Sequence, residues 1–141
     1  MEQEDKLQEV ISYPQNLKDS ALSHLVLCAN LNAGVDVTVI ISGQVVAGQL
    51  VSGREYAETQ ANGFRTANGE ETIKEVMASF FDSLANEYRN EEGHQIPLNF
   101  LHIKNPSYMQ GNGAWTTVNG TILRIPIEKV GGFSIGKVSK L

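Results

Sequence analysis

The sequence predicts an α+β protein, mostly β, built as a small, strongly bent five-stranded barrel with an N-terminal helix and a long helical insertion between strands two and three. Three observations predict this fold. Residues 17–30 carry apolar side chains at helical spacing, residues 35–51 hold two apolar stretches around a tight turn, and strand-like sequence resumes only at residue 98. Sequential strands around one core with few helices are typical of small barrels.

The first expected element is a helix over residues 17–30. Its apolar residues recur three and four positions apart, which places them on one helix face; they are Leu17, Ala21, Leu22, Leu25, Val26 and Ala29. Asn32 and Gly34 follow and suit a helix end. Residues 1–16 are polar without a sustained period, so we expect a mobile arm or a short first turn there.

Two strands are expected in residues 35–53. Val35, Val37, Val39 and Ile41 alternate with other residues at the period of a strand. Ser42-Gly43-Gln44 forms a tight turn, in which Gly43 supplies the positive φ that hairpins require. Gly48 lies inside the return strand, where a glycine marks a bend, a bulge or a close neighbour.

Residues 54–93 form the expected helical insertion. Residues 54–63 are compatible with a single helical turn, and Asn68 with Glu71 resembles a capping box before a helix over residues 70–90. The apolar stripe of that helix consists of Ile73, Val76, Met77, Phe80, Phe81, Leu84 and Tyr88. We expect the stripe to lie on the barrel or on a partner, because water would otherwise face a large apolar patch.

Three further strands are expected within residues 98–138. The first is bounded by Pro97 and Pro106, and the others cover residues 121–127 and 133–138. Pro126 cannot donate to a ladder, which indicates an open edge, a bulge or a crossing. Because no repeat, linker or low-complexity tract divides the chain, residues 1–141 are interpreted as a single domain.

The composition and charge of the chain argue against membrane, secreted and nucleic-acid-binding proteins. No apolar run is long enough to cross a bilayer, and the acidic N-terminus is unlike a signal peptide, so we expect a cytoplasmic protein without membrane contact. The net charge of −5 argues against broad attraction to nucleic acid. The single cysteine, Cys28, lies in an apolar helical run and is interpreted as a buried small side chain.

No constellation with a catalytic or metal-binding spacing is evident. The three histidines are far apart in the sequence. His24 and Cys28 lie four residues apart on one helix, but they offer only two metal ligands, so we interpret both as structural residues. His102 alternates with two apolar neighbours and is predicted to be a surface or interface residue. We therefore expect a protein without a cofactor, a metal or an enzymatic activity. The remaining alternative is an enzyme that acts on a small molecule through Asp36, His102 or Glu128.

At the level of strand order, the chain resembles Sm-like barrels of the SH3 type. Residues 35–52 resemble the first two strands, residues 100–109 the third, and residues 121–138 the closing pair. This resemblance implies a homo-oligomeric ring that binds RNA or another small ligand. In that alternative the RNA-binding residues are Lys104, Asn105 and Arg124.

A second resemblance covers most of residues 35–139. The turn and strand near residue 43, a long helical gap, a strand near residue 102 and a glycine-rich ending resemble the gas vesicle accessory protein U (GvpU) family. The residues that carry it are Gly43, Gly48, Glu55, Tyr56, His102, Lys104, Asn105, Gly132, Phe133, Gly136 and Lys137. The resemblance implies a non-enzymatic bacterial cytoplasmic protein that associates with gas vesicles, contacts shell protein and itself, and influences vesicle clustering or assembly.

Two surfaces are predicted for these contacts. Exposed strand edges invite pairing between copies, so a homo-oligomer is expected to form through residues 121–127 and 133–138. The predicted edge residues are Ile122, Arg124, Pro126, Phe133, Ile135 and Lys137. The predicted partner surface consists of Tyr56, Phe80, Phe81 and Trp115.

Overall fold

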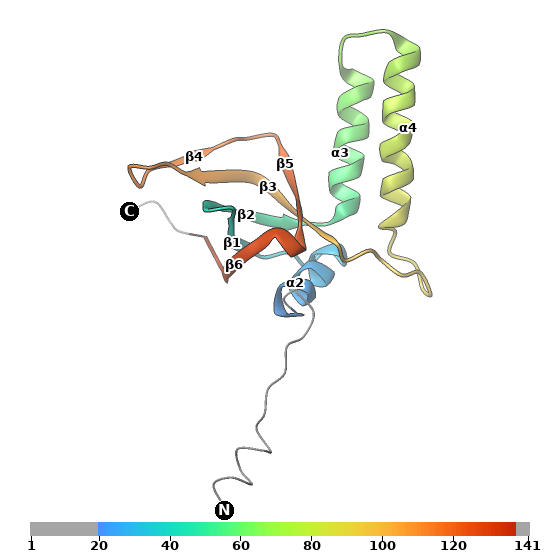
Figure 1. The fold of residues 1–141 in the computed structure, drawn as a ribbon. Coiled ribbons are helices and arrows are strands. Elements are labelled where there is room, and N and C mark those ends of the chain that lie inside the picture. Colours follow the sequence, from blue (N-terminus) through green and yellow to red (C-terminus); the bar gives the residue numbers. More distant parts are fainter. Residues whose placement is uncertain (1–19, 138–141) are drawn as a thin grey trace, which may run out of the picture.

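The computed structural model describes residues 20–137 and confirms the α+β class (Figure 1). The expected arm over residues 1–16 lies outside the described residues, as do residues 17–19 and Val138. An N-terminal helix and a helical insertion between the second and third strands are present as predicted. No helix within residues 20–137 has both the length and the apolar character needed to span a membrane.

The elements form one antiparallel sheet with two helical parts. In chain order they are α2 (Ser20–Asn30), β1 (Asp36–Ile41), β2 (Gln44–Val51), α3 (Gly53–Thr66), α4 (Glu71–Glu87), β3 (Phe100–Met109), β4 (Trp115–Thr117), β5 (Ile122–Pro126), the 3-10 helix η1 (Ile127–Lys129) and β6 (Val130–Ile135). The strand order is β4-β3-β2-β1-β6, and β5 pairs with β3 beside β4. The sheet therefore has six strands where five were expected, and it stays open because no pairing joins β5 to β6 among the described residues.

The hydrophobic core lies between α2 and one face of the sheet. Its buried members are Leu22, Val26, Ala29, Val37, Val39, Val46, Leu50, Leu101, Ile103, Ile125 and Ile127. The registers Leu101 with Ile125 and Ile103 with Leu50 place these side chains on the same face of neighbouring strands. We call the opposite face the outer face of the sheet.

The first hairpin turns as the sequence predicts. Ser42 and Gly43 have φ values of 49° and 80°, which is the pair of left-handed residues that a two-residue hairpin loop requires. Gly48 lies where the β2–β3 register shifts. A Cβ on Gly48 would overlap Ile103 and come within 2.9 Å of the Lys104 carbonyl oxygen, so of the three alternatives expected for this glycine the structure has the bulge and the close neighbour.

Pro106 is inside β3, not at its end. The preceding residue, Asn105, has a φ of 50°, and the ladder to β2 resumes at Ser107 opposite Ala47. The irregularity at this point lets a residue without an N–H pass through the strand. The short strand β4 was missed for a different reason, because its glycine- and asparagine-rich surroundings are typical of a loop.

The helical insertion is a hairpin of two long helices that projects from the sheet (Figure 1). The prediction of a single turn over residues 54–63 is wrong, because α3 runs for 14 residues and passes through Gly63. The cap of α4 is Glu70 and not Asn68: the Glu70 carboxylate accepts hydrogen bonds from the backbone N–H groups of Thr72 and Ile73.

The hairpin begins at a crowded position. The Ser52 hydroxyl caps α3 by accepting from the Glu55 N–H at 2.9 Å, and the Gly53 N–H donates to the buried Asn30 Oδ1 at 2.9 Å. A Cβ on Gly53 would overlap the ring of Tyr88, the residue that ends α4. Gly53 therefore lets the start of α3, the end of α4 and α2 meet at one point.

Substitution of Gly53 tests this packing. Gly53→Ala is expected to lower the free energy of unfolding by ~1–3 kcal/mol, because the buried Tyr88 ring must move to admit the methyl group. The measurement is urea unfolding followed by circular dichroism.

Gly63→Ala is the matched control in the same helix. Nothing lies within 4 Å of a Cβ at that position, so alanine is expected to raise stability by ~0.5–1 kcal/mol through helix propensity. Equal effects of the two substitutions would contradict the role assigned to Gly53.

Candidate functional site

The candidate site lies where the hairpin meets the outer face of the sheet, and we call it the hairpin joint. Its members are Glu55 and Tyr56 of α3, Tyr88 at the end of α4, Phe100, His102 and Lys104 of β3, and Arg124 of β5. His102 alternates with the core residues Leu101 and Ile103, and its register partner is Arg124. Strand period therefore places the joint on the face opposite α2.

His102 is enclosed by aromatic rings. The ring of Tyr56 stacks on it at 4.8 Å between centroids, and the ring of Tyr88 meets it edge-on at 5.7 Å. The side chain is only 1% exposed, so the prediction of a surface residue is wrong. The strand period placed His102 on the correct face, but a hairpin distant in sequence covers that face.

Arg124 is one of the two cations of the joint, the other being Lys104. Its Nη1 donates to His102 Nε2 at 3.1 Å and lies 3.5 Å from the Tyr88 hydroxyl. Its guanidinium carbon lies 3.8 Å from the ring centroid of Phe100 and 5.6 Å from that of Tyr56. No ion pair joins Arg124 to a carboxylate within residues 20–137, so aromatic faces and the imidazole hold this cation.

The chemistry of His102 follows from this arrangement. Burial and, secondly, the Arg124 charge lower the pKa of His102 to about 3, so the ring is neutral near pH 7. Since Nε2 accepts from Arg124, the ring proton is assigned to Nδ1, which is buried and has no hydrogen-bond partner. A histidine with this pKa and without solvent access is unsuited to general acid or base catalysis at neutral pH.

The joint brings together several residues that carry the family resemblance. Lys104 Nζ lies 3.4 Å from Glu55 Oε2, next to the stacked pair of Tyr56 and His102. The side chain of Asn105 instead points to a turn, where its Oδ1 accepts from the Gly120 N–H at 2.9 Å. The residues predicted for RNA binding are therefore engaged in internal contacts, with Lys104 paired and Arg124 stacked.

The predicted partner surface is divided by the fold. Phe81 is half-buried and contacts Tyr56 with ring centroids 6.2 Å apart, whereas Phe80 is 64% exposed on α4. Trp115 is half-buried on β4, which among residues 20–137 pairs only with the distal end of β3. The structure thus unites Tyr56 with Phe81 and places Trp115 on a separate element.

The residues predicted for the oligomer edge differ in their exposure and contacts. Ile135 is 69% exposed and Lys137 is exposed, while Ile122 is buried. Phe133 packs against the core cluster. Arg124 belongs to the joint, and Pro126 is half-buried opposite Phe100.

The apolar stripe of α4 is only partly covered. Tyr88 is 2% exposed and Ala78 is fully buried, but four large residues face water: Ile73 (64%), Val76 (65%), Met77 (41%) and Phe80 (64%). We call these four the outer α4 face. Of the two alternatives expected for the stripe, contact with the barrel is wrong for these four, because the hairpin projects away from the sheet (Figure 1), and contact with a partner stays a prediction.

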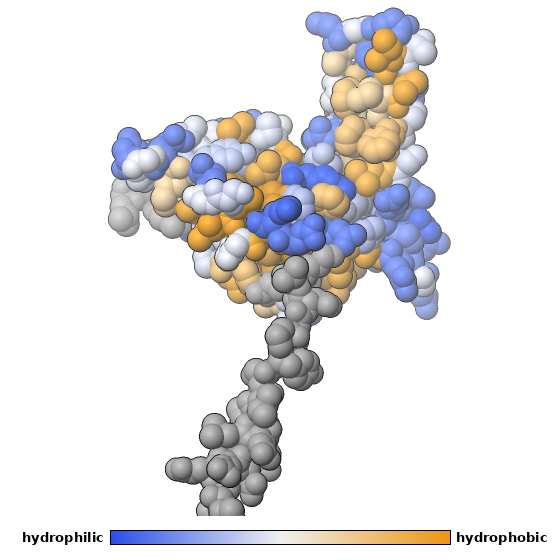
Figure 2. All heavy atoms as spheres, in the orientation of Figure 1, coloured by the Kyte–Doolittle hydropathy of each residue, from blue (hydrophilic) through white to orange (hydrophobic). Residues whose placement is uncertain are grey.

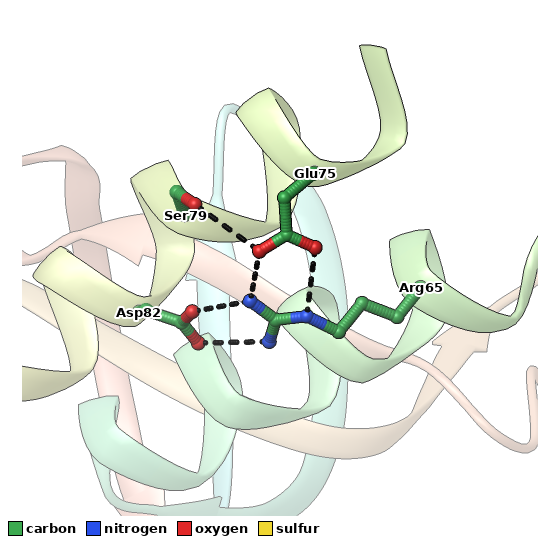
Figure 3. A network of polar contacts seen from close by, with 4 residues as sticks. All are labelled: Arg65, Glu75, Ser79 and Asp82. Carbon is green, nitrogen blue, oxygen red and sulfur yellow. Dashed lines mark hydrogen bonds and ion pairs between the residues drawn. The ribbon is translucent and has the colours of Figure 1, made fainter. Parts of the chain in front are cut away.

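An ion-pair network joins the two helices of the hairpin (Figure 3). Arg65 of α3 binds both Asp82, at 2.6 and 3.2 Å, and Glu75, at 2.9 and 3.4 Å, on α4. The hydrogen bonds from Arg65 lower the pKa of both carboxyl groups. All three side chains are largely exposed, so the network orients the hairpin more than it stabilises it.

The other candidate residues for chemistry stay apart. Asp36, His102 and Glu128 lie on β1, β3 and η1, and no hydrogen bond or ion pair joins any two of them in the described chain. His24 is exposed and Cys28 is half-buried on α2. Within residues 20–137, no group of three histidine, cysteine, aspartate or glutamate residues is placed to hold a metal ion.

The pH dependence of stability tests the neutral state of His102. Its folded pKa of about 3 is below the ordinary value of 6.5, so unfolding takes up a proton between these values. Its contribution is complete above pH ~6.5 and is lost as the pH falls, by at most ~1.4 kcal/mol per pH unit. His102→Gln is expected to lower stability at pH 7 by ~1–3 kcal/mol.

The measurement is urea unfolding of both proteins from pH 7 to pH 4. The stability difference between them should shrink as the pH falls, since His24 and His94 are common to both and cancel. A difference that stays constant with pH would overturn the assignment of a neutral, desolvated His102.

Comparison with known proteins agrees with the second resemblance. A family model described as "Gas vesicle protein GvpU-like" matches residues 19–138, which is most of the chain and includes the whole hairpin joint. Neither the curated proteins nor the solved structures contain a match. The chain therefore belongs to the GvpU-like family of gas vesicle proteins.

Proposed function

We propose that this chain is a non-enzymatic cytoplasmic accessory protein that binds gas vesicle shells, associates with itself, and thereby influences vesicle clustering or assembly. The observation that carries the proposal is the family match over residues 19–138. A protein that acts by association needs contact surfaces and no catalytic centre.

The chemistry of the hairpin joint supports a non-enzymatic role. Its imidazole is neutral and enclosed, and its guanidinium is stacked on aromatic rings. Such a joint holds two parts of the fold together. RNA binding stays a prediction that no observation here favours, since Lys104 and Arg124 have internal partners.

For the shell contact we propose the end of the sheet around Trp115. Met109 is its register partner on β3 and is 37% exposed, and the nearby Val118 is 40% exposed. An aromatic residue with apolar neighbours is the usual anchor of a protein interface. Because β4 is a short strand in a loop-rich segment, this surface belongs to a part of the fold that the core does not need.

For self-association we retain the sheet edges. In the described chain β6 pairs with β1 alone, and β5 with β3 alone, so each strand has one free edge. Gly136 N–H donates to the Asp36 carbonyl at 2.6 Å, and alternation along an antiparallel ladder then directs the Ile135 N–H outward. Free N–H and C=O groups at an edge can pair with another copy.

A flotation assay tests shell binding. Purified gas vesicles rise on centrifugation, and the full chain is expected to rise with them. Trp115→Ala should weaken this binding roughly 30-fold or more if Trp115 is the anchor. Ile40→Ala, which shortens an exposed apolar residue on β1, should leave it unchanged. Failure of the unaltered chain to rise with vesicles would contradict the proposed function.

A proline substitution tests the β6 edge. Ile135→Pro removes the outward N–H and is tolerated on an edge strand, so edge-paired oligomers should dissociate. Ile135→Ala keeps the N–H and should preserve them. Sedimentation velocity distinguishes the two variants, and identical profiles would exclude pairing through this edge.

A further inference from the structure

Every large apolar side chain of the hairpin that is exposed in the described structure belongs to the outer α4 face. Ile73, Val76, Met77 and Phe80 are spaced by three, one and three residues, which places them on one side of α4. Figure 2 shows apolar surface on the hairpin well away from the sheet. Exposed patches of this kind mark interaction sites.

The hairpin itself has only a thin interior. The buried residues of α3 are Gly53, Ala57 and Ala61, and Ala78 is the buried residue of α4. Small side chains let the two helices approach closely, and the half-buried rings of Phe64 and Phe81, 5.7 Å apart, stack between them. Two helices alone therefore make one layer, whereas stable helical units normally pack a second layer on the apolar side.

We propose that the outer α4 face docks on the same face of a second copy, so that two hairpins form a four-helix bundle. This inference deepens the self-association part of the proposed function and assigns it a surface separate from the sheet edges. A two-fold axis makes one patch its own partner, which is the commonest symmetry of homo-oligomers.

The area available fits a dimer. With exposed fractions of 41–65%, the four side chains leave roughly 400–500 Å² of apolar surface in water. Burying this patch on both copies removes roughly 800–1,000 Å² from solvent, which approaches the ~1,000 Å² of a biological interface before any rim contact is added.

The shape of the surface also suits a second copy. A shallow hollow of about 680 Å³ opens beside Val76, and its lining residues are Glu71, Thr72, Glu75, Val76 and Ser79. Phe80 is the bulkiest side chain of the outer α4 face. Val76 belongs to both the hollow and the outer α4 face, so the hollow adjoins this face and leaves room for side chains at the rim of a docked copy.

Charge does not oppose the approach of two identical faces. Glu75 is held by Arg65 of α3, and Glu71 pairs with Lys74 at 3.1 Å. The uncharged residues Thr72 and Ser79 lie beside Val76 around the hollow. Like charges are thus neutralised within each copy, so pairing does not confront unpaired charges at the centre of the interface.

The experiment uses the full chain carrying Ile135→Pro, which removes pairing through the β6 edge. Sedimentation equilibrium of this protein is expected to show a dimer at about 100 µM. Adding Phe80→Glu, or Val76→Glu, places a carboxylate in the docked face and should raise the dimer dissociation constant roughly 30-fold or more. Both positions are exposed, so circular dichroism should show an unchanged fold.

The matched control is Asn62→Glu, which adds the same charge at an exposed position on α3. It should leave the dimer intact. A monomer before the α4 substitutions are added, or a dimer that persists after them, would overturn the inference. So would a loss of vesicle flotation without a change in oligomeric state, because the shell would then be the occupant of this face. Vesicle flotation by the Phe80→Glu protein separates this test from that of the proposed function.

Discussion

The contacts of the Tyr56 and Tyr88 rings with His102, whose Nε2 accepts a hydrogen bond from Arg124, hold the helical hairpin on the outer face of the sheet. They join β3, β5 and the hairpin at one point, and the Phe100 ring completes the setting of the guanidinium. A cation without a carboxylate partner is stable here because aromatic faces and a neutral imidazole share its charge. Burial keeps the His102 imidazole neutral, and only a neutral imidazole can accept the hydrogen bond from Arg124, so the joint depends on this desolvation.

The position of the joint decides which surfaces are open. The hairpin meets the sheet at its base and projects from it, and within the described residues the outer α4 face stays uncovered (Figure 1). Arg65 orders the distal half of the hairpin by tying Glu75 and Asp82 to α3. The three proposed contact surfaces, at Trp115, at the sheet edge and on α4, lie on different elements. A protein that binds a second copy of itself through one surface and a vesicle shell through another can link vesicles together.

Local patterns predicted most elements of the fold but few of its contacts. The strand period located β1, β2 and the face of His102, and Gly43 located the turn, because these signals depend on neighbours in sequence. The extent of α3 was missed because Gly63, which has a low helix propensity and is typical of a break, lies inside the helix. The burial of His102 was missed because Tyr56 and Tyr88, which cover it, are 46 and 14 residues away.

What the sequence by itself determined is the α+β class, the order of helices and strands, the hairpin turn and the family. These depend on side-chain periodicity, turn stereochemistry and short motifs, which act within a few residues. Only the tertiary structure decided that His102 is neutral and enclosed, that the apolar stripe of α4 divides into a covered base and an open face, and that the sheet stays unclosed. Each of these depends on which distant segment covers a given side chain, because burial and desolvation are properties of the packed chain.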